Sequence, residues 1–418
     1  MFMDARRWLN IGGTVFGWLS FISAFVYACA LFALNLSAFP SNVGVSEWWG
    51  SELAIRYCSG FVRRGILGQT AWSFTSLFDK QSAYVVVLST LMALSSVILG
   101  FLLLYCLRKK LSLLPALLVL FSPTAYPVML THAGSLFRKD AFQLCLFFLI
   151  LLLVKKFDES SSSLRKSFLY FASAGLQIFA VLNHEPFALL ILPALFLARL
   201  FASHGYRDAL MFSVPGVATF LLAAAYKGRP QDVSCLQTSL QSIGLLPPGA
   251  KPGSSITELA LTKPSFFTWD LTTDQLAWSL LHAILAICIT WSCYVLIARR
   301  TKISYLPWKQ AGLFLLIQLL VALPLYMATI DYGRWFAMLA CAGMLALLSM
   351  PRSESVNTRK VQMLATKTDR TMARTPLVVL SIACILVTPT HCCTYEFAQI
   401  FTSIPYSGIG IWKQMLTP

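Results

Sequence analysis

The sequence predicts an all-α, polytopic transmembrane helical bundle, and three observations support that prediction. Apolar runs long enough to cross a bilayer as helices recur from one end of the 418-residue chain to the other. The composition is 57% hydrophobic and only 12% charged, whereas an average soluble domain is about a quarter charged. Together with a mean hydropathy of +0.70, these features exclude an ordinary cytosolic enzyme, a disordered chain and a secreted disulfide scaffold.

We expect about eleven transmembrane helices in a single integral membrane domain that covers residues 1–418. The first follows Met1–Trp8 and is interpreted as a retained anchor, because it is too long for a signal-peptide core. Several others are shorter than the roughly 20 residues that span a bilayer. These either start inside the flanking polar motifs or are partly re-entrant. The expected helices lie near 12–36, 83–107, 111–130, 138–154, 168–183, 186–201, 209–226, 276–298, 311–330, 335–350 and 376–391.

The basic residues predict the orientation of this bundle. About two thirds of the 33 Lys and Arg residues fall in alternate connecting segments that share a side with the N-terminus, and cytoplasmic segments carry such an excess. The N-terminus is therefore expected inside and the C-terminus outside. Residues 37–82 and 227–275 are then outer loops, and 351–375 is a basic cytoplasmic linker. Because membrane topology accounts for the net charge of +16, we expect no nucleic-acid partner.

Four polar motifs embedded in apolar sequence share the outer side of this topology. Charged residues at membrane ends need partners or water, so they often mark a site or a pathway. Four motifs on one face predict a single outward-facing polar chamber. The motifs are Ser59–Gly65, Phe137–Asp140, Asn183–Pro186 and Asp331–Arg334.

Three of the motifs also have a structural interpretation. Arg63 and Arg64 can anchor the chain to lipid phosphates, although two flanking glycines would let an anion approach the backbone. Residues 138–140 can form an ion pair at a helix start, and Asp331 can pair with Arg334 three residues later. The adjacent His and Glu of Asn183–Pro186 have little structural use between two apolar helices, so that motif is the best functional candidate.

The first outer loop carries further candidates. Trp48, Trp49 and Trp72 are expected to anchor the loop at the membrane interface, or alternatively to form a platform for sugar rings. Glu47 and Glu52 lie in the same loop, where many lipid-sugar-dependent membrane transferases keep their base. Cysteines on the outer side can oxidise if that side is periplasmic, but the sequence leaves their pairing open among Cys58, Cys235, Cys392 and Cys393.

The chain lacks the short motifs that bind nucleotides or metals. There is no GxxxxGK[ST] loop, no GxGxxG and no HExxH, so ATP hydrolysis by this chain is not expected. No cluster of His, Cys and acidic residues has metal-ligand spacing. We therefore expect no cofactor and no metal.

The layout resembles that of the Wzy-type polymerases of O-antigen, capsule and exopolysaccharide in bacterial inner membranes, and more loosely that of related lipid-sugar-dependent glycosyltransferases. The shared pattern comprises about a dozen helices, a basic chain and arginine motifs at the outer ends of helices. In sequence the resemblance covers the four polar motifs, and in topology it covers most of the chain.

This resemblance implies a metal-independent reaction in a multi-pass protein of the inner membrane. The donor would be an oligosaccharide on undecaprenyl or another polyprenyl diphosphate, and the acceptor a second such molecule. A chain-length regulator and a flippase would be partners in the cell. Cationic side chains can stabilise the diphosphate leaving group, which is the role implied for Arg63, Arg64, Arg138, Lys139 and Arg334. The base that accepts the proton of the acceptor hydroxyl would be Glu185 or His184, with Asp331 and Asp140 as substitutes.

Two other functions remain open. A transferase of single sugars from a polyprenyl phosphate would place its base at Glu47 or Glu52. The other is a flippase or transporter of lipid-linked glycans, which discontinuous helices in both halves of the chain would favour.

Overall fold

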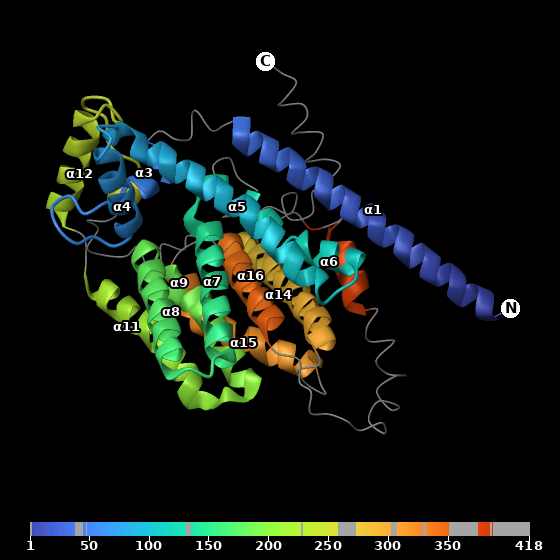
Figure 1. Cartoon of the computed structure of the whole chain (residues 1–418). Coiled ribbons are helices and arrows are strands. Elements are labelled where there is room, and N and C mark those ends of the chain that lie inside the picture. The colour runs from blue at the N-terminus through green and yellow to red at the C-terminus, as the bar shows by residue number, and fades with distance from the viewer. Residues whose placement is uncertain are drawn as a thin grey trace, which may run out of the picture.

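The computed structural model describes residues 2–37, 45–46, 48–130, 135–226, 229–257, 273–301, 307–328, 332–350, 375–384 and 387. Every regular element within these ranges is helical (Figure 1). The α-helices are α1 (Phe2–Ser37), α3 (Trp48–Ala54), α4 (Ile66–Ser76), α5 (Tyr84–Arg108), α6 (Leu113–Leu120), α7 (Lys139–Glu159), α8 (Ser163–Asn183), α9 (Pro186–Leu190), α10 (Leu192–Arg199), α11 (Gly205–Ala225), α12 (Pro230–Ser242), α13 (Ser254–Thr257), α14 (Thr273–Thr301), α15 (Pro307–Ala328), α16 (Tyr332–Ser349) and a last helix, Thr375–Cys384.

Most apolar runs form helices where the sequence predicts them, but the single helix expected at 111–130 was wrong. Helix α6 ends at Leu120, and the chain continues through a bend into the short 3₁₀ turn η2 (Tyr126–Leu130). Pro123 and Pro127 explain the break, because proline has no N–H for the helical ladder and disfavours the α conformation of the preceding residue.

Three helices in the described ranges are long and apolar enough to cross a membrane, which indicates a membrane-associated protein. They are Gln81–Arg108, Gly205–Ala225 and Trp308–Tyr326. A fourth crossing is possible if Ser163–Asn183 and Pro186–Ala202 act as one span, although the chain bends by 119° between them. Large apolar side chains face outward on these helices, as Phe101 and Leu221 do, in the way that lipid-facing residues must.

Helix α16 forms the centre of the main hydrophobic core. It packs against α7, α10, α14 and α15, and nearly all of its side chains are buried. Small residues permit these close contacts; a Cβ added at Gly343 would lie 1.7 Å from the Tyr294 hydroxyl. The position of α16 matters for function because its first turn carries Arg334.

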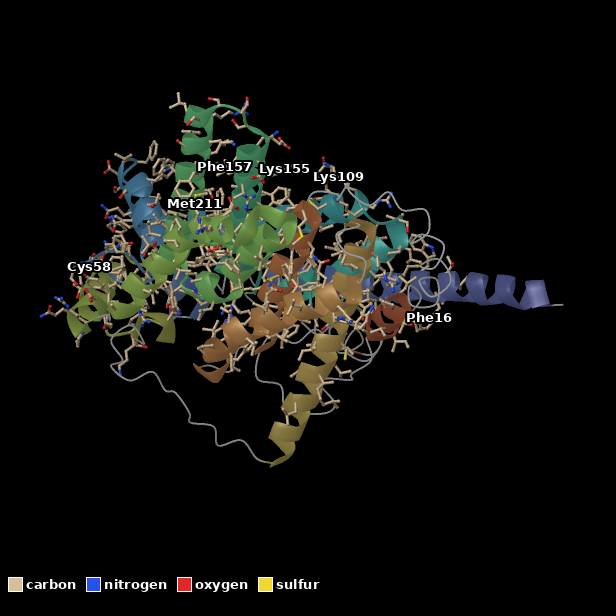
Figure 2. The ribbon with its side chains drawn as sticks, turned by 90° about the horizontal axis from the view of Figure 1, so that it is seen from below. Phe16, Cys58, Lys109, Lys155, Phe157 and Met211 are labelled. Atoms are coloured by element: carbon tan, nitrogen blue, oxygen red, sulfur yellow. A yellow bond between two sulfur atoms is a disulfide. The ribbon has the colours of Figure 1, made fainter. Side chains whose placement is uncertain are left out.

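A second, smaller core joins the two long loops that the sequence places on one side. Helices α3, α4, α12 and α13 pack together against the start of α5, and we call this unit the cap. In Figure 1 the cap lies at one end of the molecule, and in Figure 2 its Cys58 lies on the opposite side from Phe16 of α1. Helix α4 packs so closely against the segment that follows α3 that a Cβ at Gly68 would lie 2.0 Å from the Ile55 carbonyl oxygen. This contact fixes the turn that carries Arg63 and Arg64.

Candidate functional site

Charged residues from five segments of the chain meet where the cap joins the main core. They come from α3, the turn before α4, the start of α7, the break between α8 and α9, and the first turn of α16. Contacts and electrostatic interactions link them into one group. We call this group the charge cluster: Glu52, Arg63, Arg64, Arg138, Lys139, Asp140, His184, Glu185 and Arg334.

The break between α8 and α9 places His184 and Glu185 in the cluster. Pro186 cannot continue α8, because its ring would clash with the carbonyl of Leu182, and it instead occupies the first turn of α9. His184 adopts an extended conformation at the end of α8. As a result both side chains leave the helical path and reach residues of the cap and of α16.

Glu185 is held by the two arginines that precede α4. Its Oε2 accepts a hydrogen bond from Arg64 Nε at 2.9 Å, and its Oε1 lies 3.7 Å from Arg63 Nη1. Burial alone would raise the pKa of Glu185, but the adjacent Arg64, together with His184 and Arg63, outweighs burial and lowers that pKa to about 2. Arg64 has a φ of 66°, an uncommon conformation for a residue with a Cβ. The turn is thus held in one arrangement.

Lys139 links the arginine turn to the end of α8. Its Nζ donates to the Arg64 carbonyl at 3.2 Å and to the Asn183 carbonyl at 3.3 Å. Arg138, the N-cap of α7, is also buried, and its charge acts on Glu52. The ammonium group therefore joins three segments through backbone oxygens.

Arg334 binds the side chain of Asp140 across 194 residues of sequence. Its Nη2 donates to Oδ1 at 2.7 Å and its Nε donates to Oδ2 at 2.5 Å, and both residues are almost fully buried. The helix-start interpretation of Asp140 is incomplete, because the carboxylate binds an arginine of another helix. A cation in the first turn of a helix opposes the helix dipole, and Asp140 offsets that cost.

His184 lies between Arg334 and Glu52. Its Nε2 is 3.1 Å from Arg334 Nη2, and its Nδ1 is 3.6 Å from Glu52 Oε1. Burial, assisted by Arg64 and Arg334, holds the pKa of His184 well below its ordinary value, so the ring is neutral near pH 7. Burial would raise the pKa of Glu52, but Lys139 and the surrounding arginines outweigh it and lower that pKa.

The cluster carries more positive than negative charge. It contains five cationic side chains and three carboxylates, so with a neutral His184 the described residues leave an excess of two positive charges. Most of its side chains are buried, and Arg63 and Arg64 form its more exposed edge, at 33% and 25%. Such a group can bind an anion through charge-assisted hydrogen bonds. No group of three His, Cys, Asp or Glu in the described ranges is arranged to hold a metal ion.

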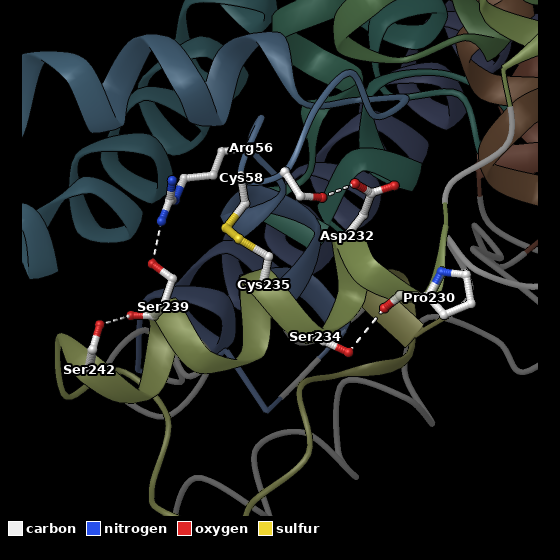
Figure 3. The surroundings of a disulfide bond; sticks show 9 residues. Arg56, Cys58, Pro230, Asp232, Ser234, Cys235, Ser239 and Ser242 are labelled. Atoms are coloured by element: carbon white, nitrogen blue, oxygen red, sulfur yellow. Dashed lines mark hydrogen bonds between the residues drawn. A yellow bond between two sulfur atoms is a disulfide. The ribbon is translucent and has the colours of Figure 1, made fainter.

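A disulfide fixes the cap beside the cluster. Cys58, five residues before Arg63, is bonded to Cys235 of α12 (Figure 3). Around it Ser59 donates a hydrogen bond to Asp232, and Arg56 donates to Ser239. These contacts tie the arginine turn to the second long loop.

Several other candidate residues differ in the structure from what the sequence predicts, or lie outside the part that it describes. Trp72 is neither a free platform nor a simple anchor, because Arg56 stacks on its ring at 3.7 Å within the cap. Glu47 and Asp331 lie outside the described residues. The sequence suggests Glu52 for one alternative function only and gives no sign of its contact with His184. No local pattern signals a contact between residues so far apart in sequence.

Comparison with models of known protein families, with curated proteins and with solved structures gives no match to this chain.

Proposed function

We propose that the protein is an inner-membrane glycosyltransferase that polymerises polyprenyl-diphosphate-linked oligosaccharide units on the periplasmic face for a surface polysaccharide. The observation that carries the proposal is the gathering of five cationic side chains in the charge cluster, where the described residues include three carboxylates. The N-termini of α7 and α16 meet there, and helix N-termini add positive potential. A diphosphate has the charge and the oxygen atoms to match these donors.

The proposed roles follow from exposure. Arg63 and Arg64 form the accessible edge of the cluster, so they would contact the diphosphate first. Their contacts with Glu185 would then be replaced by hydrogen bonds to the diphosphate oxygens. The deeper cations Arg138, Lys139 and Arg334 would stabilise the charge that develops as the bond to the sugar breaks. Arginine suits this task because its planar fork binds two oxygens at once.

The acceptor hydroxyl requires a base, and His184 fits that role better than Glu185. Both carboxylate oxygens of Glu185 face arginines, Oε2 at 2.9 Å from Arg64 Nε and Oε1 at 3.7 Å from Arg63 Nη1, so they are poorly placed to accept a proton from a hydroxyl. Glu185 is better suited to orient Arg63 and Arg64. Asp140 is engaged by Arg334, so among the described candidates Glu185, His184 and Asp140 the neutral ring of His184 is the preferred base.

The disulfide supports an outward location of this site. Stable disulfides form in oxidising compartments such as the periplasm, and Cys58–Cys235 joins the two loops that basic-residue counting predicts outside. In the cell, a flippase would deliver the lipid-linked substrate to this face and a chain-length regulator would act on the product.

Substitution of Arg64 tests the proposal. Arg64→Ala should lower polymer formation tens- to hundreds-fold, because a lost charge-assisted contact in a water-poor site costs roughly 2–4 kcal/mol. Arg64→Lys keeps the charge but not the fork, so partial activity should remain. The measurement is glycan chain length on a gel, made in cells of the source strain that lack the chromosomal gene.

The exposed Arg165 of α8 provides the matched control, and Arg165→Ala should give full-length glycan. Membrane levels of each variant must be equal. Normal glycan in Arg64→Ala, Arg138→Ala and Arg334→Ala alike would refute the diphosphate site.

One observation favours a second candidate, the transferase of single sugars from a polyprenyl phosphate. Glu52, a possible base for that reaction, is buried in the charge cluster rather than exposed in a loop. If Glu52 is itself the base, Glu52→Gln should abolish glycan modification while His184→Gln retains it. The polymerase predicts loss of long glycan in His184→Gln.

A further inference from the structure

The protonation pattern of His184 follows from its neighbours. A guanidinium group can only donate hydrogen bonds, so Nε2, at 3.1 Å from Arg334 Nη2, must be the acceptor. In the neutral ring the proton then resides on Nδ1. That nitrogen faces Glu52 Oε1 at 3.6 Å, and within the described residues neither atom has a hydrogen-bond partner.

We infer that Glu52 is the positioning residue of His184: its carboxylate holds the ring in the Nδ1–H tautomer and leaves Nε2 as the proton acceptor. The inference rests on the proposed function, in which His184 is the base. The distance of 3.6 Å is longer than a hydrogen bond, and such contacts commonly shorten when substrate binds. Glu52 and His184 belong to the cap and to the α8–α9 break, so their contact also couples these two parts.

The proton transfer balances with the groups named. The acceptor hydroxyl oxygen forms a bond to the anomeric carbon of the donor sugar while its proton moves to Nε2. The bond between that carbon and the diphosphate oxygen breaks, and the electron pair leaves with the diphosphate. The imidazolium that forms is stabilised by the ionised Glu52 next to Nδ1–H. It returns its proton to water when the products leave.

Arg334 makes the availability of His184 Nε2 depend on bound substrate. Its Nη2 donates to both His184 Nε2 and Asp140 Oδ1, so it occupies the side of the ring that the hydroxyl must reach. When Arg334 turns to a diphosphate oxygen, it releases Nε2. The base would thus become available only with the leaving group bound.

Several charged groups besides Glu52 surround His184, and some of them shift its pKa. Arg64, Arg334 and Lys139 lower its pKa and Glu185 raises it, while burial is the largest influence. Removal of the Glu52 carboxylate takes away one negative neighbour and should lower the pKa of His184 further. The charged and titratable groups around the ring, from all segments that meet there, are Glu52, Arg64, Arg138, Lys139, Asp140, Glu185 and Arg334.

The first test is the tautomer itself. The full-length protein, labelled with ¹⁵N-histidine and held in detergent micelles, contains five His residues, and the spectrum of His184→Gln identifies the signals of His184. We expect a protonated Nδ1 and an unprotonated Nε2 at pH 7. In Glu52→Gln the protonation midpoint of His184 should fall by about one pH unit. A protonated Nε2, or a midpoint that does not change, overturns the inference without reference to activity.

The second test is the pH profile of polymer formation, followed in cells at controlled external pH. Glu52→Gln should lower glycan yield roughly 10- to 100-fold and move the acidic limb of the profile to lower pH, whereas Glu52→Asp should restore part of the yield. A merely structural role would lower the yield without moving the limb. The exposed Glu159 gives the control variant Glu159→Gln, which should leave both unchanged.

The two tests separate the inference from the proposed function. If the tautomer and its response to Glu52→Gln are as expected but His184→Gln still makes long glycan, His184 is not the base and its role in the proposed function fails. If His184→Gln abolishes polymer but Glu52→Gln leaves the acidic limb of the pH profile unchanged, the proposed function stands and the positioning role of Glu52 fails.

Discussion

Helix α7 has a buried arginine from another helix at each end, and the two arginines are neutralised differently. At its C-terminal end, Arg199 of α10 donates to Asp158 and Asp208 at 2.6 Å each, and its guanidinium lies 4.8 Å from the centre of the Phe212 ring. One cation there meets two carboxylates. At the N-terminal end, Arg334 donates hydrogen bonds to Asp140, and both belong to a cluster in which the described cations outnumber the described carboxylates.

Under the proposed function, this difference separates a structural ion-pair network from a site that binds an anionic substrate. Asp158 and Asp208 lie 41 and 9 residues from Arg199, so that network joins neighbouring helices of one half of the chain. Its buried cation is bound by two partly exposed carboxylates that water can also reach. The charge cluster gathers segments from Glu52 to Arg334, and among the described residues its cations outnumber its carboxylates. Burial of an uncompensated positive charge away from water raises the free energy of the folded protein, and a bound anionic substrate would offset that increase.

The largest effect is expected when Arg334 is removed. Arg334→Ala leaves the Asp140 carboxylate buried without its two donors, and a broken buried pair costs about 3–5 kcal/mol. The measurement is thermal unfolding of the purified protein in detergent micelles, alongside glycan chain length.

The matched variant replaces both partners, Arg334→Met with Asp140→Leu. It should recover most of the stability, because no charge is left unpaired, but it should make no long glycan. If the double variant makes normal glycan, Arg334 is a structural residue like Arg199, and the comparison of the two ends of α7 loses its functional meaning.

A smaller loss of stability is expected from a substitution at the C-terminal end of α7. Arg199→Ala should destabilise the protein by about 2–3 kcal/mol, less than the buried pair, because Asp158 and Asp208 are 31% and 21% exposed and water can replace part of the contact. Glycan made per folded molecule should stay normal. A selective loss of chain length at unchanged protein level would show that this network also serves catalysis.

The four polar motifs can be recognised from the sequence, but the contacts between the residues of the charge cluster cannot. Arg63, Asp140, Glu185 and Arg334 stood out because charge between apolar helices is costly, and that signal is local. Their partners are not local: Asp140 and Arg334 are 194 residues apart, and periodicity carries no information on which helix ends meet. For the same reason the sequence indicates Glu52 only as a loop carboxylate. The expected number of eleven spans and their orientation stay predictions, since length and composition qualify three or four helices.

Acid should weaken the cluster through Glu185. Its folded-state pKa of about 2 lies below the ordinary value of 4.5, so its contribution is complete above about pH 4.5 and declines as the pH falls toward 2. At pH 3 the loss should reach about 2 kcal/mol.

The measurement compares thermal unfolding of the wild type and Glu185→Gln from pH 3 to pH 7. Because other carboxylates titrate in both proteins, the difference between them isolates Glu185. Parallel curves over this range would mean that Arg63 and Arg64 do not stabilise the ionised form in solution.

The smallest effect on stability is expected from the disulfide. Cys58→Ser with Cys235→Ser should cost about 1 kcal/mol, less than the 2–4 kcal/mol typical of disulfides, because inserted helices already restrict the unfolded chain. Glycan yield per folded molecule should also fall, since Cys58 lies beside the arginine turn. Alkylation with and without reductant checks that the bond forms in cells. Equal yield from the double variant would show that Arg56–Ser239 and Ser59–Asp232 suffice to hold the turn.

The bend of 119° between α8 and α9–α10 limits how the length of this chain can change. Only His184 and Glu185 separate the two helices, so one inserted residue would rotate the side chains on one side by about 100° and shift them by about 1.5 Å. Substitutions at the bend alter single contacts, whereas an insertion or deletion would misplace the whole set. At the other end of α8, Ser160–Ser162 connect α7 to α8 through a polar, mostly exposed segment that can absorb an added residue. Related chains that share this chemistry should therefore keep the spacing from Asn183 to Pro186 while they vary in length between α7 and α8.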